Sequence, residues 1–171
     1  MSALGLKEGE VKILPYSPSW VKSFETEKKK ILTLKGIKDV QHIGSTSVPG
    51  MAAKPIVDMI VGIERYADYK KLINALERIG FSYKFEPRRY QALFVKKNAH
   101  GESTHYLKIL RYNGIHWKQY LHVKHVLISN KKLFGEYMRI KITSAKLHHA
   151  ERKEYTKSKK EIINKIVSSN I

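Results

Sequence analysis

The sequence contains no cysteine among its 171 residues. Without thiols the chain cannot form disulfides, thiolate metal sites, iron–sulfur clusters or a cysteine nucleophile. It also lacks any apolar run near the roughly 18 residues that a membrane-spanning helix needs. Its first residues are too polar for a secretory signal. From these absences we expect a soluble, cytoplasmic protein with no membrane partner.

Acidic residues are scarce. There are 15 Asp and Glu against 33 Lys and Arg, which gives a net charge of +18. Residues 1–85 hold 14 basic and 9 acidic side chains, whereas residues 86–171 hold 19 and 6. Such an excess predicts attraction to polyanions such as nucleotides or RNA. Lysine far outnumbers arginine, however, and a lysine-rich solvated surface explains the charge equally well.

The hydrophobic pattern mixes short strands with amphipathic helices, and it is typical of an α+β fold with a mixed β-sheet flanked by helices. We expect a single domain over residues 1–171, with a sheet-containing core at about 10–112 and a helical segment at about 115–171. The expected strands are 37–43, 56–63, 81–85, 91–96 and 105–110, and the expected helices are 17–34, 66–79 and most of 117–171 with a break near Asn130.

One strand stands out because it is almost wholly apolar yet contains an acid. Residues 56–63 are the apolar run of a central strand, and Asp58 is its one charged residue. A carboxylate in such a strand costs several kcal/mol unless it is paired, metal-bound or at an exposed strand end. We expect the Asp58 carboxylate to emerge beside His42 or His105. A structural acceptor of backbone hydrogen bonds is the other interpretation of Asp58.

A glycine- and hydroxyl-rich turn precedes that strand. Glycine permits close backbone approach to a phosphate, and hydroxyls and backbone N–H groups bind its oxygens. A phosphate cradle followed by a carboxylate that holds Mg²⁺ is the layout of a nucleotidyl-transfer site. The predicted phosphate-binding residues of this segment are Gly44, Ser45, Thr46, Ser47 and Lys54, and the predicted metal ligand is Asp58.

The stretch from His42 to Asp58, HIGSTSVPGMAAKPIVD, closely resembles the GrpB family. The resemblance continues at Pro15–Trp20, Arg88–Tyr90, Thr104–Lys108, Glu136–Tyr137 with Lys141, and Tyr155 with Lys159. This resemblance implies the nucleotidyltransferase superfamily, with the fold of DNA polymerase β, and therefore a mixed sheet of nucleotidyltransferase type with a helical C-terminal third.

The sequence departs from the superfamily pattern at its acids. That pattern places a second acid two residues after the first and a third on a later strand. Here the second position is Ile60, and the later strand, Thr104–Leu110, contains no acid. Two-metal phosphoryl transfer needs several carboxylates. One carboxylate can hold a single Mg²⁺ together with substrate phosphates.

Several further residues are candidates for the same site. His105 is a candidate catalytic base beside Asp58, although a satisfied half-buried histidine is an equal alternative. Arginine forks suit phosphates, so one of Arg88 and Arg89 is expected to face the cleft. Lys108 and Lys124 are the remaining predicted phosphate-binding residues.

Two functions remain open at this point. The first is a nucleotide-binding protein with Mg²⁺-dependent nucleotidyl-transfer activity toward an unknown acceptor. The second is a catalytically degenerate module that binds a nucleotide, another phosphorylated small molecule, or RNA through its charge. The sequence does not identify the acceptor, the base preference or the oligomeric state.

Overall fold

The structure is a computed structural model that describes residues 4–148 and 151–168, apart from the side chains of residues 87, 88 and 152. Its elements are α1 (Ser19–Leu32), β1 (Ile37–Ile43), η1 (Ser45–Ser47), β2 (Val57–Ile63), η2 (Tyr66–Leu72), α2 (Ile73–Arg78), β3 (Phe81–Arg88), β4 (Gln91–Lys97), β5 (Ser103–Arg111), α3 (Ile115–Ser129), α4 (Lys131–Leu147), α5 (Arg152–Ser158) and α6 (Lys160–Ser168). The α+β class and the helical C-terminal segment are confirmed.

The five strands form one mixed sheet in the order β1-β2-β5-β4-β3. Only β2 and β5 run parallel, and every other neighbouring pair is antiparallel. Six of the seven residues of β2 are buried, and Asp58 is the half-buried exception. The apolar run therefore forms a central strand covered on both faces, as its composition predicts.

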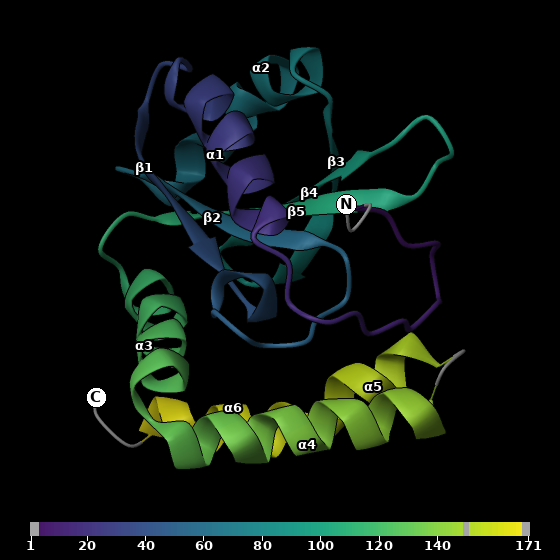
Figure 1. Cartoon of the computed structure of the whole chain (residues 1–171). Coiled ribbons are helices and arrows are strands. Elements are labelled where there is room, and N and C mark those ends of the chain that lie inside the picture. Colours follow the sequence, from purple (N-terminus) through teal and green to yellow (C-terminus); the bar gives the residue numbers. More distant parts are fainter. Residues whose placement is uncertain (1–3, 149–150, 169–171) are drawn as a thin grey trace.

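Helices cover the two faces of the sheet unequally. On one face α1 packs through Trp20, Phe24 and Ile31 against the inward side chains of the strands, and η2 and α2 complete that core. On the other face Trp117 of α3 packs against Ile60. Figure 1 shows α1 lying across the sheet, with α4 to α6 gathered as a separate layer beyond one end of it.

The segment between η1 and β2 links the sheet to that helical layer. Val48 and Met51 are buried in a cluster with Leu127, Tyr137 and Ile162 of the C-terminal helices. A hydrophobic cluster of this kind fixes the helices against the loop that follows β1. The layer is thus anchored at the loop that the sequence marks as functional.

One element differs from its predicted form. The sequence pattern predicts a single amphipathic helix over residues 66–79, but they form the 3-10 turn η2 followed by the short helix α2. Side chains three residues apart eclipse one another in a 3-10 helix. The ion pairs of this segment have that three-residue spacing, because Asp68 pairs with Arg65 on one side and with Lys71 on the other.

Two glycines provide a stability test of this packing. A Cβ on Gly62 would lie 2.8 Å from Tyr112 and 3.0 Å from Trp117, whereas nothing lies within 4 Å of one on Gly135. We expect Gly62→Ala to lower the free energy of unfolding by about 1–3 kcal/mol through overpacking. Gly135→Ala, in helix α4, should raise it by about 0.5–1 kcal/mol. Urea unfolding of both variants measures the pair, and equal effects would contradict the packing described here.

Candidate functional site

The glycine at the end of β1 brings the loop against Asp58. Ile43 pairs with Asp58 across the β1–β2 ladder, and Gly44 then turns the chain with a φ of 68°. A Cβ at Gly44 would lie 3.0 Å from the Asp58 Oδ2 atom. Glycine is required here both for the left-handed backbone and for the close approach. The carboxylate therefore lies at the start of η1.

The hydroxyl groups of the loop are largely engaged within the protein. The Ser47 hydroxyl donates to the Gly44 carbonyl at 2.7 Å. The Thr46 Oγ1 atom lies 3.0 Å from the His42 Nε2 atom in a buried contact. Ser45 is half-buried and hydrogen-bonds to Tyr137 of α4. Of the three predicted hydroxyl ligands, Ser45 is the one placed beside Asp58 and the helical layer.

Three lysines lie near this point, one on α4, one at the residue that follows α5 and one in the loop before β2. Lys141 is 1% exposed, and its ammonium donates to the Ala52 carbonyl. Lys54 lies 5.2 Å and Lys159 3.8 Å from the centre of the buried Tyr155 ring. We call Lys54, Lys141 and Lys159 the lysine cluster. Of its three members, only Lys54 is predicted from the sequence.

Electrostatic interactions link Lys141 to the other two members of the lysine cluster and to Asp58. Burial lowers the pKa of Lys141 well below its ordinary value, and the positive charges of Lys159 and Lys54 lower it further. The Asp58 carboxylate acts in the opposite direction on that pKa. Burial likewise raises the pKa of Tyr137, and Asp58 adds to the increase. The Asp58 carboxylate therefore acts on Lys141, to which Lys54 and Lys159 add two further positive charges.

His105 lies on the other face of the sheet from Asp58. Val57 pairs with His105, while Asp58 pairs with Tyr106, and neighbours in register point to the same side. The His105 ring is buried, with Nε2 3.0 Å from the Ser23 hydroxyl of α1. His42 is also on the α1 side, stacked on Phe24. The expectation that Asp58 emerges beside either histidine is therefore wrong.

Arg88 and Arg89 lie at the far end of the sheet. Arg88 pairs with Gln91 in the hairpin, and Ala92 pairs with Ile109 near the end of β5. Asp58 lies at the opposite end of these strands. Arg89 is exposed and stacks on Tyr90 at 4.8 Å, and the side chain of Arg88 lies outside the described part. The expected arginine of the cleft is thus not brought to Asp58.

The last two predicted lysines, Lys124 and Lys108, lie between the sheet and helix α3. Lys124 of α3 donates to the His42 carbonyl at 3.0 Å, and burial lowers its pKa. Lys108 pairs in register with Ile60, on the Asp58 face of the sheet, and lies 4.8 Å from the ring centre of Tyr120. Lys124 therefore reaches from α3 to β1, whereas Lys108 reaches from β5 to Tyr120 of α3.

Comparison with known proteins identifies the family of this chain. The family model described as GrpB protein matches residues 10–169. The chain belongs to the GrpB family. It is 30% identical to the glutamate-rich protein GrpB of Alkalihalophilus pseudofirmus, over 96% of this chain and 98% of that protein. The crystal structure of conserved protein GrpB from Enterococcus faecalis superposes with a TM-score of 0.82 and 29% identity, covering 91% of this chain and 94% of that one.

A more distant likeness concerns the fold alone. The Cid1 poly(U) polymerase, solved as an H336N mutant bound to MgATP, superposes with a TM-score of 0.55 and 17% identity. The match covers 78% of this chain and 44% of Cid1. This GrpB chain therefore has the nucleotidyltransferase fold that the sequence resemblance implies. Among the described residues no helix is long and apolar enough to cross a membrane.

Gly44 and Gly50 allow the Asp58 contact to be measured. Both have a left-handed backbone, with φ of 68° and 77°, but only at Gly44 would a Cβ meet Asp58. Alanine at either position should cost about 1–3 kcal/mol of unfolding free energy for the backbone conformation, with the larger cost at Gly44, whose ψ of −171° lies in a region almost confined to glycine. We expect Gly44→Ala to cost more than Gly50→Ala, because the carboxylate must also move. Chemical denaturation of both variants compares them, and equal losses would mean that the contact carries no strain.

The buried histidines should make stability depend on pH. Burial lowers the pKa of His42 to about 3 and that of His105 to about 4. Because the unfolded chain takes up these protons near the ordinary histidine pKa of about 6.5, stability is lost as pH falls from there toward 4. Each histidine should contribute about 2–3 kcal/mol of this loss.

His105→Gln isolates one histidine of the pair. We expect the variant to show a shallower decrease in unfolding free energy than the wild type between neutral pH and about pH 4.5. Carboxylates titrate in the same range, but they do so in both proteins and cancel in the comparison. Urea unfolding across this range measures the difference, and parallel curves would show that His105 does not remain neutral in the folded state.

Proposed function

We propose that this GrpB protein is a phosphate-binding module that recognises nucleotides or related phosphorylated small molecules without a catalytic metal pair. The site is the Gly44–Ser45 turn together with Asp58 and the lysine cluster. The observation that supports the proposal is the charge arrangement around the buried Lys141: the Asp58 carboxylate acts on it, and so do Lys54 and Lys159, which are half-buried and not fully enclosed.

The chemistry of phosphate groups suits this arrangement. Ammonium groups bind phosphate oxygens through charge-assisted hydrogen bonds, which are about twice as strong as neutral ones. The desolvated Lys141 is held at a depressed pKa by burial and by its two neighbours. An incoming phosphate would supply the missing negative charge and favour the charged form of all three lysines. The Ser45 hydroxyl lies at the same point of the loop.

The residues present do not fit a pair of magnesium ions. Among residues 4–148 and 151–168, no group of three or more His, Asp or Glu side chains is arranged to hold a metal ion. Mg²⁺ prefers oxygen ligands, commonly one or two carboxylates and substrate phosphates. Here the Asp58 carboxylate acts on the buried ammonium of Lys141, and Lys54 and Lys159 add positive charge that repels a cation. We therefore propose that the lysines, and not metal ions, neutralise the negative charge of the phosphate.

Mg²⁺-dependent nucleotidyl transfer is the second candidate function. It is favoured by the nucleotidyltransferase fold and by the Asp58 carboxylate lying against Gly44 of the Gly-Ser turn. In that case the Asp58 carboxylate would hold a single Mg²⁺ that arrives with the nucleotide. His105 cannot serve as its base in this conformation, because it lies on the other face of the sheet. The two candidates make opposite predictions for Asp58.

Binding of inorganic triphosphate, ATP and UTP distinguishes them. We expect calorimetric titration to give the same affinity with Mg²⁺ and with a chelator present. Asp58→Asn should strengthen binding, because it removes a negative charge that repels phosphate. Lys54→Gln and Lys159→Gln should each weaken binding about tenfold, since each removes a charge-assisted hydrogen bond. Loss of binding in Asp58→Asn, together with dependence on Mg²⁺, would overturn the proposal in favour of nucleotidyl transfer.

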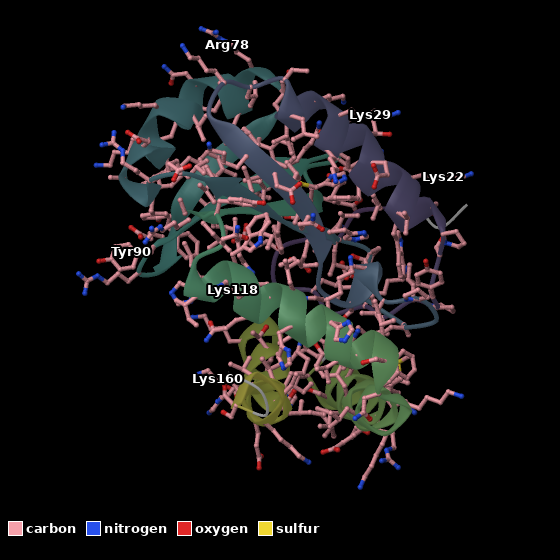
Figure 2. The ribbon with its side chains drawn as sticks, turned by 90° about the vertical axis from the view of Figure 1, so that its left-hand side faces the viewer. Lys22, Lys29, Arg78, Tyr90, Lys118 and Lys160 are labelled. Carbon is pink, nitrogen blue, oxygen red and sulfur yellow. The ribbon has the colours of Figure 1, made fainter. Side chains whose placement is uncertain are left out.

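Lys160→Gln is the matched control. Lys160 follows Lys159 directly, carries the same charge, and is exposed on α6, where Figure 2 shows it on the outer side of the helical layer. Its substitution should leave triphosphate affinity within about twofold. If Lys160→Gln and Lys159→Gln weaken binding equally, the affinity comes from net charge and not from a built site.

A further inference from the structure

A second surface of the molecule lies at the other end of the sheet from Asp58. A cavity of about 300 Å³ is lined there by Tyr66, Tyr90, Arg111, Gly114, Ile115 and His116. Strands β2 and β5 separate it from the lysine cluster. At 3.3 Å per residue, the five steps from Asp58 to Ile63 span about 17 Å. We call this cavity and its rim the tyrosine surface.

The tyrosine ring at the centre of this surface is exposed but firmly held. Tyr90 is 47% exposed and has a left-handed φ of 64°. Its backbone N–H donates to the Glu86 Oε1 atom at 2.6 Å, and the Tyr66 hydroxyl donates to the same oxygen at 2.7 Å. The Tyr66 ring lies edge-on to Tyr90 at 5.5 Å.

This arrangement is unusual for a surface turn. A bulky residue with a positive φ costs about 1–3 kcal/mol, and it persists only where surrounding contacts over-determine it. Here the Glu86 carboxylate supplies those contacts. Tyr90 thus occupies a turn position that favours asparagine or glycine. Its aromatic face is presented to solvent in one orientation.

Positive charge surrounds the ring. Arg89 stacks on Tyr90 with its guanidinium 4.8 Å from the ring centre. Arg111 is exposed on the rim, and Lys118 is exposed three residues after Ile115, on the same side of α3. The nearby acid, Glu86, is engaged by Tyr66 and Tyr90. Figure 2 shows Tyr90 projecting outward at the tip of its hairpin, with Lys118 on α3.

We propose that the tyrosine surface binds single-stranded nucleic acid, with a base stacked on Tyr90 and backbone phosphates held by Arg89, Arg111 and Lys118. An exposed aromatic face bordered by cations is the combination that sequence-tolerant single-strand binding requires. In a duplex the interior bases are covered on both faces by stacking, so only the terminal pairs offer an exposed face. The inference is independent of the phosphate site beside Asp58, because the two sites share no residue.

The test measures, by fluorescence anisotropy, how labelled oligouridylate RNA and oligothymidylate DNA bind to the full chain. We expect both to bind, and a blunt duplex of equal length to bind more weakly. Tyr90→Asn keeps a residue that accepts a positive φ while removing the ring, and it should weaken single-strand binding about tenfold. Tyr90→Phe should retain the wild-type affinity. Thermal unfolding of each variant establishes that the hairpin and the rest of the fold are intact.

Charge variants separate this surface from general attraction. Arg111→Gln should weaken binding and reduce the slope of log affinity against log salt by about 0.7 for each phosphate that is no longer neutralised. Arg78→Gln and Lys29→Gln remove exposed charges that Figure 2 shows far from Tyr90, and they should change affinity much less. The proposal is overturned if Tyr90→Asn binds like the wild type, or if all charge variants weaken binding equally.

Discussion

The architecture depends on the desolvated contact between Lys141 and the loop that surrounds Asp58. An ammonium group that is 1% exposed is costly unless its hydrogen bonds and its charge are compensated. The Ala52 carbonyl accepts a hydrogen bond from it, the Tyr137 ring lies 5.5 Å away, and Asp58 provides the opposing charge. Because these partners come from the sheet and from α4, the contact joins the two layers of the molecule.

That contact explains why the loop has the shape it has. Gly44 must have its left-handed backbone so that the chain can pass the Asp58 carboxylate. Val48 and Met51 then enter the hydrophobic cluster of the C-terminal helices, which holds α4 and its lysine in place. A change at any of these positions alters the position of Asp58 relative to the lysine cluster. The proposed phosphate ligand would also stabilise the folded state by neutralising the lysines, so the proposal links ligand binding to fold stability at this point.

The strands and the loop could be predicted from the sequence, because their signals are local. The apolar run of β2, the glycine after β1 and the break at Asn130 depend on residues that are neighbours along the chain. Asn130 indeed begins α4, with its side chain accepting a hydrogen bond from the Leu133 N–H. The lysine cluster was not predictable in this way. Lys141 comes close to Asp58, and Lys159 to Lys141, only because the helical layer folds back on the loop.

The predictions that His105 and an arginine of the Arg88–Arg89 turn lie beside Asp58 failed for geometric reasons. His105 is paired with Val57 and not with Asp58, and a shift of one residue along a strand changes the face on which a side chain lies. The Arg88–Arg89 turn joins strands that run antiparallel, so it falls at the end of the sheet that Asp58 does not occupy. Residue types suggest what these groups could do, but register and strand direction determine which groups meet.

The positive charge of the chain is divided between the two ends of the sheet. The basic second half of the sequence supplies Lys141 and Lys159 at one end of the sheet and Arg89, Arg111 and Lys118 at the other. At Asp58 the positive charge is desolvated and arranged around one carboxylate, which suits a small, highly charged ligand. At Tyr90 it is exposed and spread around an aromatic ring, where each charge is screened by salt. The same net charge thus favours a compact phosphate at one end and an extended polyanion at the other, and burial, more than charge, determines the difference.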